Sequence, residues 1–274
     1  MSEFQFPLAG SINLNCRLGS GSLGVHAEAG CREARVSVTP RHSGSDVLQR
    51  STIELHGNTL IVHVPNERGR TALTSIFSPH SEDEVDIVVT VPEGTATEVR
   101  FGAAEVNLHG RNGSLDLSGG AGDANVDQID GEVRLHTGTG DVKISTITGQ
   151  ASVKTGSGQI TLGEVNGDLV ASVGSGRLEL GVARGKVSMK AGSGGAEIGS
   201  VEQDVDLSSG SGSMTIGLAA GVPARLNART GSGRVHTEMP MEEFAPSGQS
   251  GIEVKARTGS GNITIRRAVA PVAS

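Results

Sequence analysis

Two aspartates, Asp123 and Asp141, have the clearest spacing for chemistry in this sequence. They lie in GGAGDANVD and HTGTGDVKI, 18 residues apart, and each follows a glycine turn. If the two turns stack on neighbouring strands, their carboxylates come about 5 Å apart, because that is the spacing of strands in a sheet. Retaining glycosidases use a carboxylate pair at this separation. Since no Tyr or Trp is present to form a sugar platform, we interpret both as solvated turn residues and keep them as contact candidates.

Three further motifs resemble known sites but lack the context that those sites need. Residues 19–24, GSGSLG, fit the dinucleotide fingerprint GxGxxG, but no helical pattern follows. Residues 119–127 approach a calcium-binding nonapeptide, but the Asp comes one place early and the motif does not recur. His109 and Asp127 fall in one predicted column without a Ser in register to complete a triad. We therefore predict that the chain is not an enzyme and has no cofactor and no metal site.

The chain has two cysteines, Cys16 and Cys31. They lack the paired-cysteine spacing of zinc sites, so we interpret them as thiols in a reducing compartment. A disulfide between them, or a metal site together with His26, stays open at this point.

The element that must position these residues is a repeat of 18 residues. From Gly102 to Gly210, the first glycine of each turn recurs six times at this interval. The glycines that we predict to be structural are Gly120, Gly138, Gly156, Gly174, Gly192, Gly210, Gly231 and Gly259. In the regular copies, aliphatic residues or Met stand four and six positions after the glycine, as at Ile160 and Leu162, and a second alternating segment follows another glycine. Each repeat is therefore two short strands of period two, with glycine at corners that need a positive φ or a close backbone approach.

A pair of short strands cannot bury its apolar face alone, but stacked repeats can. Like residues then lie about 4.8 Å apart on neighbouring strands. We predict an all-β fold, a single-stranded parallel β-solenoid (β-helix) with 18-residue coils. An antiparallel β-sandwich is the alternative, but it gives no reason to keep an 18-residue period. The turn serines should form a structural hydroxyl column: Ser157, Ser175, Ser193, Ser211, Ser232 and Ser260.

The predicted domain has an irregular and a regular part. Residues 1–100 should form irregular N-terminal β coils and a cap, and residues 101–268 the regular repeats. An acidic flap at 237–251 interrupts the repeats, and it contains the contact candidates Met239, Met241 and Phe244. Because the ends of a solenoid are unpaired strand edges, they are either capped or template end-to-end assembly.

Charge and hydropathy restrict the partners. A net charge of −7, with no aromatic residues among the 23 basic ones, disfavours nucleic acid. No run of about 18 apolar residues predicts a membrane span. The N-terminal residues MSEFQFPLAG lack the basic region and apolar run of a secretory signal, which predicts a cytoplasmic location.

Three stretches resemble a known family. The unit TGSG-x-I-x-L, the strand EVDIVVTVPEG and the closing TGSGNITIRRA resemble the bacterial "putative adhesin" family, a β-strand-repeat domain of unknown function, and its actinobacterial members most of all. The resemblance runs from about residue 10 to Ala268 and implies no catalytic residues. We predict a non-enzymatic structural or protein-interaction module that binds a protein, with its own copies through edge pairing among the candidates. The alternatives are an adhesin-like or glycan-binding surface protein, as the resemblance implies, and a polysaccharide-cleaving β-helix enzyme.

Overall fold

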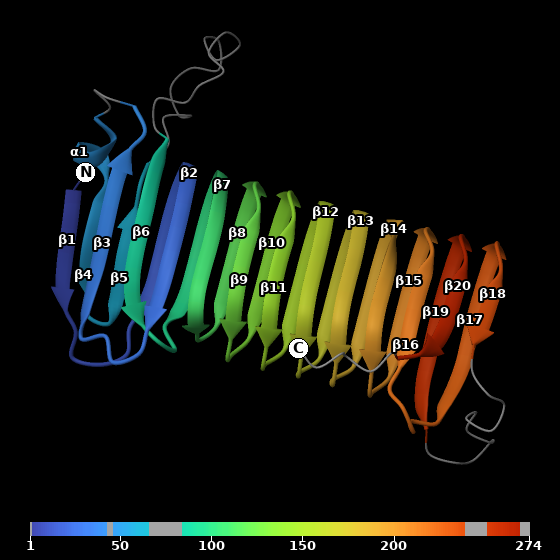
Figure 1. Cartoon of the computed structure of the whole chain (residues 1–274). Helices are drawn as coiled ribbons and strands as arrows, with labels where there is room; N and C mark the ends of the chain where they lie inside the picture. The colour runs from blue at the N-terminus through green and yellow to red at the C-terminus, as the bar shows by residue number, and fades with distance from the viewer. Residues whose placement is uncertain (1, 43–45, 66–83, 239–250, 269–274) are drawn as a thin grey trace, which may run out of the picture. The chain divides into compact units, whose positions relative to one another are not determined.

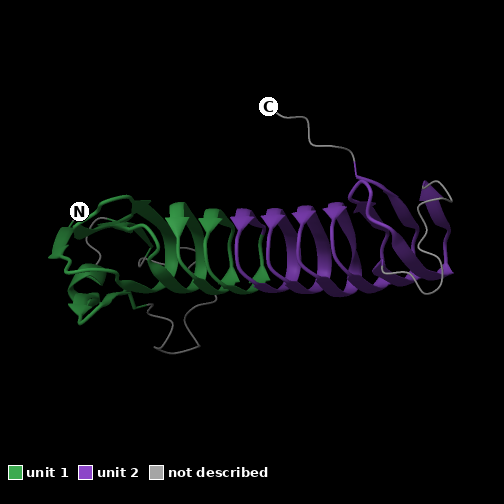
Figure 2. Ribbon diagram, turned by 90° about the horizontal axis from the view of Figure 1, so that it is seen from below, with its two compact units in different colours: residues 1–140 green, residues 141–274 purple. Residues whose placement is uncertain are grey.

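The protein is all-β. The computed structural model describes residues 2–42, 46–65, 84–238 and 251–268. Within these ranges it contains strands and one four-residue helix, α1 (Val47–Arg50), as Figure 1 shows. The chain divides into two compact units, residues 1–140 and 141–274, coloured separately in Figure 2. In the described part of the chain, no helix has the length and apolar character that a membrane span needs.

Unit 1 combines parallel and antiparallel pairs. Its strands are β1 (Ser2–Pro7), β2 (Asn13–Glu28), β3 (Glu33–Pro40), β4 (Thr52–His56), β5 (Thr59–His63), β6 (Val85–Pro92), β7 (Ala96–Asn112), β8 (Leu115–Ala121), β9 (Ala124–Ile129) and β10 (Val133–Thr139). Strand β2 is parallel to β7 on one side and to β5 and β6 on the other. Strand β7 in turn pairs in parallel with β8 and β9.

Three pairs at the start of unit 1 are antiparallel, namely β1 with β3, β3 with β6, and β4 with β5. The pairing is therefore not parallel throughout, which the 18-residue period did not reveal. The local cause is clear for β4 and β5. Only Gly57 and Asn58 join them, and Gly57 has a φ of +58°. A two-residue turn with positive φ closes an antiparallel hairpin, whereas parallel strands need a long connection.

Unit 2 is parallel in every strand pair described within it. Its strands are β11 (Val142–Ile147), β12 (Ala151–Val165), β13 (Leu169–Ala183), β14 (Val187–Val201), β15 (Val205–Ser211), β16 (Met214–Leu218), β17 (Ala224–Ser232), β18 (Val235–Glu238), β19 (Ile252–Ser260) and β20 (Ile263–Arg267). From β12 to β15 the register advances by 18 residues per strand: Ala151 pairs with Leu169, Leu169 with Val187, and Val187 with Val205.

The last strands of unit 2 do not follow chain order. Chain order alone would place the copy at 224–238 before the copy at 252–267. Instead, β15 pairs with β19 and β19 pairs with β17, while β16 pairs with β20 and β20 with β18. The chain thus forms the last strands of the ladder, β17 and β18, before it forms β19 and β20. These two then lie between the last strands and β15 and β16, which Figure 1 shows as red strands between orange ones.

Aliphatic columns form the core of unit 2. One column holds Ile160, Leu178, Ala196, Met214 and Ile263, and each is at most 2% exposed. The turns approach too closely for any side chain. A Cβ at Gly174 would lie 2.5 Å from the carbonyl oxygen of Gly156, and one at Gly176 would lie 2.0 Å from that of Gly158. Both distances are far below a van der Waals contact, so glycine is required at these corners.

Candidate functional site

The end of the ladder in unit 2 exposes residues that the interior buries. Val235 stands in the same column as Ile263, but it is 45% exposed whereas Ile263 is fully buried. On β17, Leu226 is also half-buried although its partner Val254 is fully buried. The ladder thus ends on an incompletely covered apolar edge.

The backbone of this end also presents hydrogen-bonding groups. The N–H of Ile263 donates to the carbonyl oxygen of Arg234 over 2.9 Å. In a parallel ladder alternate residues direct both backbone groups to the same side, so Val235 and Thr237 direct theirs away from β20. Among the residues that the structure describes, these groups have no backbone partner, and unpaired groups of this kind are a template for a further strand. We call Leu226, Val235 and Thr237, with the strands β17 and β18 that carry them, the terminal edge.

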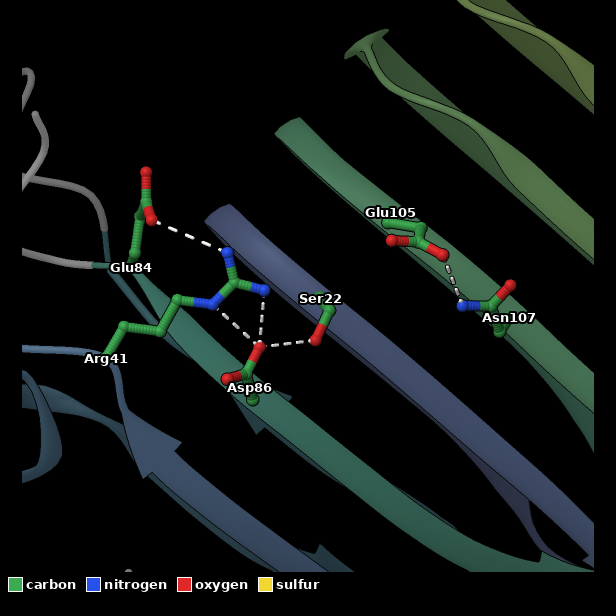
Figure 3. A network of polar contacts seen from close by, with 6 residues as sticks. All are labelled: Ser22, Arg41, Glu84, Asp86, Glu105 and Asn107. Atoms are coloured by element: carbon green, nitrogen blue, oxygen red, sulfur yellow. Dashed lines mark hydrogen bonds and ion pairs between the residues drawn. The ribbon is translucent and has the colours of Figure 1, made fainter. Parts of the chain in front are cut away.

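At the start of unit 1, side-chain hydrogen bonds hold the strands together. Asp86 on β6 accepts hydrogen bonds from Ser22 Oγ at 2.6 Å and from Arg41 Nη2 at 2.7 Å, as Figure 3 shows. Arg41 Nη1 also lies 3.6 Å from Glu84 Oε2. The hydrogen bonds from Arg41 are the largest reason that the pKa of Asp86 is below its ordinary value, and the hydrogen bond from Ser22 lowers it further. This network joins β2 and β6 to the segment after β3.

The aspartates singled out for chemistry lie in turns. Asp123 belongs to unit 1 and Asp141 to unit 2, so their predicted stacking stays a prediction. Asp141 Oδ1 accepts a hydrogen bond from the backbone N–H of Gln159 over 2.8 Å. Asp168 accepts one from the N–H of Lys186 in the same way, over 2.9 Å. A carboxylate that accepts a hydrogen bond from a backbone N–H of the next repeat has a structural use. The interpretation of Asp123 and Asp141 as solvated contact candidates stays a prediction.

The histidine and carboxylate pair of unit 1 is present. His109 Nδ1 lies 3.5 Å from Asp127 Oδ2, and both side chains are more than half exposed. The His26 ring stacks on that of His109 with centroids 5.1 Å apart. Across the described residues, however, no three His, Cys, Asp or Glu side chains are placed to hold a metal ion.

The cysteines are free thiols. Cys16 is fully buried, and burial raises the pKa of its thiol to about 12. Cys31 is half-buried and its Sγ lies 3.0 Å from the carbonyl oxygen of Glu33. The disulfide that the sequence left open is absent from this structure.

A depression on unit 1 collects polar side chains, among them Asn15, Glu98, Glu132 and Arg134. Two of its carboxylates have partners: Glu98 accepts a hydrogen bond from Asn15 at 2.8 Å, and Arg134 lies 2.8 Å from Glu132. A third carboxylate, that of Asp116, also lines the depression. The contact candidates Met239, Met241 and Phe244 lie outside the described residues.

The pairing aligns the turn serines as predicted. Ser157, Ser175, Ser193 and Ser211 pair in sequence, and Ser260 lies between Ser211 and Ser232. The terminal edge itself was missed by sequence reasoning, because the repeat gives each copy a strand but does not say which copy lies last.

These features define an all-β repeat domain whose strands stack in parallel over most of its length. The chain belongs to the Toastrack DUF4097 family, whose model matches residues 20–269. No curated protein matches the sequence.

Three solved structures that match along nearly the whole chain share little sequence with it. A "putative adhesin" from Bacteroides fragilis is 14% identical with a TM-score of 0.48, and the match covers 97% of this chain and 96% of that one. A "putative cell adhesion protein" from Clostridium sporogenes is 15% identical with a TM-score of 0.23, covering 97% and 99%. A "putative lipid binding protein" from Parabacteroides distasonis is 9% identical with a TM-score of 0.38, covering 98% and 96%.

Proposed function

We propose that this protein is a non-enzymatic interaction module, a single-stranded parallel β-solenoid with 18-residue coils that binds another protein through the terminal edge. The observation that carries the proposal is the contrast in one column, where Val235 is 45% exposed and Ile263 is buried. Covering an apolar residue and pairing free backbone groups both favour the addition of a strand.

A second copy of the chain is the partner that we propose first. Two terminal edges can pair antiparallel about a two-fold axis, because each then presents the same residues to the other. Such pairing gives a closed dimer. A cytoplasmic location and a likeness to actinobacterial family members are part of the same proposal.

The alternatives make different predictions. A polysaccharide-cleaving enzyme would lose activity when Asp123 or Asp141 is replaced by alanine, and unchanged activity in both variants would exclude that role for them. The alternative of a glycan-binding surface protein depends on other residues, which the next subsection describes.

Mass in solution across a concentration series tests the proposal. Light scattering must be paired with refractive index, because the chain has no Tyr or Trp to absorb at 280 nm. We expect the wild-type mass to rise from monomer to dimer with concentration. Val235→Lys should remain monomeric, since it places a charge on the edge, and Thr237→Pro should do the same by removing an outward N–H.

Val170→Lys is the matched control, because Val170 is 54% exposed but lies on β13, which has a strand on each side within its ladder. We expect this variant to dimerise like the wild type. A wild-type chain that stays monomeric throughout, or a Val170→Lys variant that is monomeric like Val235→Lys, would contradict the proposed edge.

A further inference from the structure

A row of cations accompanies the repeat. Gly19 aligns with Gly102 in the pairing of β2 with β7, so the repeat has ten copies when this one is included. The position two residues before the first turn glycine holds Lys or Arg in six of them, His in one and Ser in three. It holds no Asp or Glu in any copy, although the chain has 30 acidic residues against 23 basic ones. The charge at this position is therefore opposite in sign to that of the whole chain.

In unit 2 the strand register brings these residues together. Strand pairing places them side by side on adjacent strands, in the order Lys154, Ser172, Lys190, Ser208, Arg257 and Arg229. All six are exposed. We call this set the cation row. Because neighbouring strands are about 4.8 Å apart, Lys154, Lys190 and Arg257 recur at about 10 Å.

The basic side chains of this row differ from others in unit 2 in the interactions that they make. None of its four basic side chains has an ion pair or a side-chain hydrogen bond within the described part of unit 2. Some basic residues in other rows of the unit do have partners: Arg184 pairs with Glu164, and Lys186 lies 3.6 Å from Asp204. The row thus keeps its charge available to a ligand.

The surroundings of the row are narrow and polar. On one side lie exposed turn glycines such as Gly192 and Gly210, which have no side chain, and beyond them the serine hydroxyls. On the other side acidic residues begin at Asp206 and continue at Asp204 and Glu253. The row thus borders a bare strip of backbone and a line of hydroxyl groups on one side, and on the other side residues of both charges, since Asp206 is paired there with Lys255.

A single row of cations fits an extended acidic polymer better than a membrane surface or a nucleic acid. An anionic membrane is a plane, so it would also face the acidic residues beside the row. Single-stranded nucleic acid is held by aromatic stacking in most binding grooves, and this chain has no Tyr or Trp. An acidic sugar chain can be held without the aromatic platform of a glycosidase site, by hydrogen bonds to hydroxyl groups and by charges at its own repeat, and serines and spaced lysines provide both.

We propose that the cation row binds an extended acidic polysaccharide whose carboxylates or sulfates recur at about 10 Å, twice the strand spacing. The inference rests on the proposed function only in that both make the protein a binding module. The two sites share strand β17, which carries Arg229 of the row, but the variants that test them replace different residues, so one can fail without the other.

The test is a binding measurement with a polymer of alternating glucuronate and N-acetylglucosamine, using a neutral sugar polymer as the blank. The variant is Lys154→Ser, Lys190→Ser and Arg257→Ser together, because serine already occupies this position in other copies. We expect its affinity to fall at least about tenfold, as for three exposed ion pairs lost, and to depend less on salt. Its mass in light scattering should match the wild type, which separates this result from the terminal edge.

The matched control removes three cations from other rows of unit 2, as Lys143→Ser, Arg177→Ser and Lys186→Ser together. We expect it to bind the acidic polymer within about twofold of the wild type. An equal loss in both triple variants, or no wild-type binding, would overturn the proposal. Tighter binding to single-stranded DNA or to phosphatidylserine vesicles than to the polysaccharide would overturn the choice of partner.

Discussion

Unit 2 contains the hexapeptide ARTGSG twice, at 228–233 in and after β17 and at 256–261 in and after β19. The two copies lie side by side in parallel, yet their environments differ. Ala256 is fully buried while Ala228 is half-buried, and the residues that follow differ even more, at Ile263 and Val235. The reason is position, since β19 has β15 on one side and β17 on the other. The repeated sequence sets the shape of a strand, but its place in the ladder decides whether it serves as core or as a binding edge.

The largest difference between the two copies should come from their glycines. A Cβ at Gly261 would lie 2.3 Å from the carbonyl oxygen of Gly212, and one at Gly233 would lie 2.1 Å from that of Gly261. Gly261→Ala forces apart strands that are held on both sides, so we expect it to cost more than about 4 kcal/mol. Gly233→Ala can relax by moving the terminal strand outward and should cost about 2 kcal/mol. Denaturant unfolding followed by far-ultraviolet circular dichroism measures both.

A control for the glycine pair is Gly10→Ala, because nothing lies within 4 Å of a Cβ there. It should change the unfolding free energy by less than about 0.5 kcal/mol. Equal losses for Gly261→Ala and Gly233→Ala would mean that the terminal strand is as constrained as the interior one.

The next largest difference in unfolding free energy between the two copies should come from truncating an aliphatic side chain in each. Ile263→Ala removes a fully buried side chain and should cost about 3 kcal/mol, including the cavity that it leaves. Val235→Ala removes a side chain that is already 45% exposed and should cost less than about 1 kcal/mol. The same unfolding measurement, at a concentration where the protein is monomeric, checks the pair. A cost for Val235→Ala that approaches that of Ile263→Ala would show that the edge is covered.

The start of unit 1 differs from the terminal edge because a network of side-chain hydrogen bonds joins β2 and β6 to the segment after β3, and this network should give a pH dependence. The folded pKa of Asp86 lies below its unfolded value, so its stabilisation is present above the unfolded value, about 3.9, and is lost as the pH falls through the folded pKa. Since Asp86 is 40% exposed, solvent screening limits the contribution to less than about 1 kcal/mol.

Arg41→Gln tests that contribution. We expect it to lower the unfolding free energy at pH 7 by a few tenths of a kcal/mol to about 1 kcal/mol and to leave stability at pH 3 nearly unchanged. Denaturation curves at both pH values measure the difference. A loss that is as large at pH 3 as at pH 7 would assign the effect to packing instead of charge.

The smallest predicted effect is a difference in reactivity between the two cysteines, and it involves no change in stability. Burial raises the pKa of Cys16 to about 12, whereas Cys31 is half-buried. A thiol must ionise to react, so an alkylating reagent at pH 8 should add one label to the folded chain and two to the unfolded chain. Mass spectrometry counts the labels and locates the first at Cys31. Rapid labelling of Cys16 in the folded chain would show that β2 is not held between its neighbours.

The sequence predicted the strands, the 18-residue register of unit 2 and the alignment of its serines, because all three follow from the period of the repeat and from the steric demands of its turns. It did not reach the order of the last strands, since a parallel copy fits equally well before or after its neighbour. The antiparallel start of unit 1 was hidden as well, although the Gly57–Asn58 turn is a hairpin signal. The cation row was visible as a position without acids, but only the register shows that Arg257 comes before Arg229.

Amide hydrogen exchange of the two ARTGSG copies, at a low and a high protein concentration, tests the central claim most directly. We predict that residues 256–265 exchange slowly at both concentrations, because β19 and β20 lie between strands. Residues 228–237 should exchange quickly when dilute and slow down when concentrated, as the terminal edge pairs with a second copy. Exchange at 228–237 that is the same at both concentrations would contradict the claim that this edge is where the protein binds its own copy.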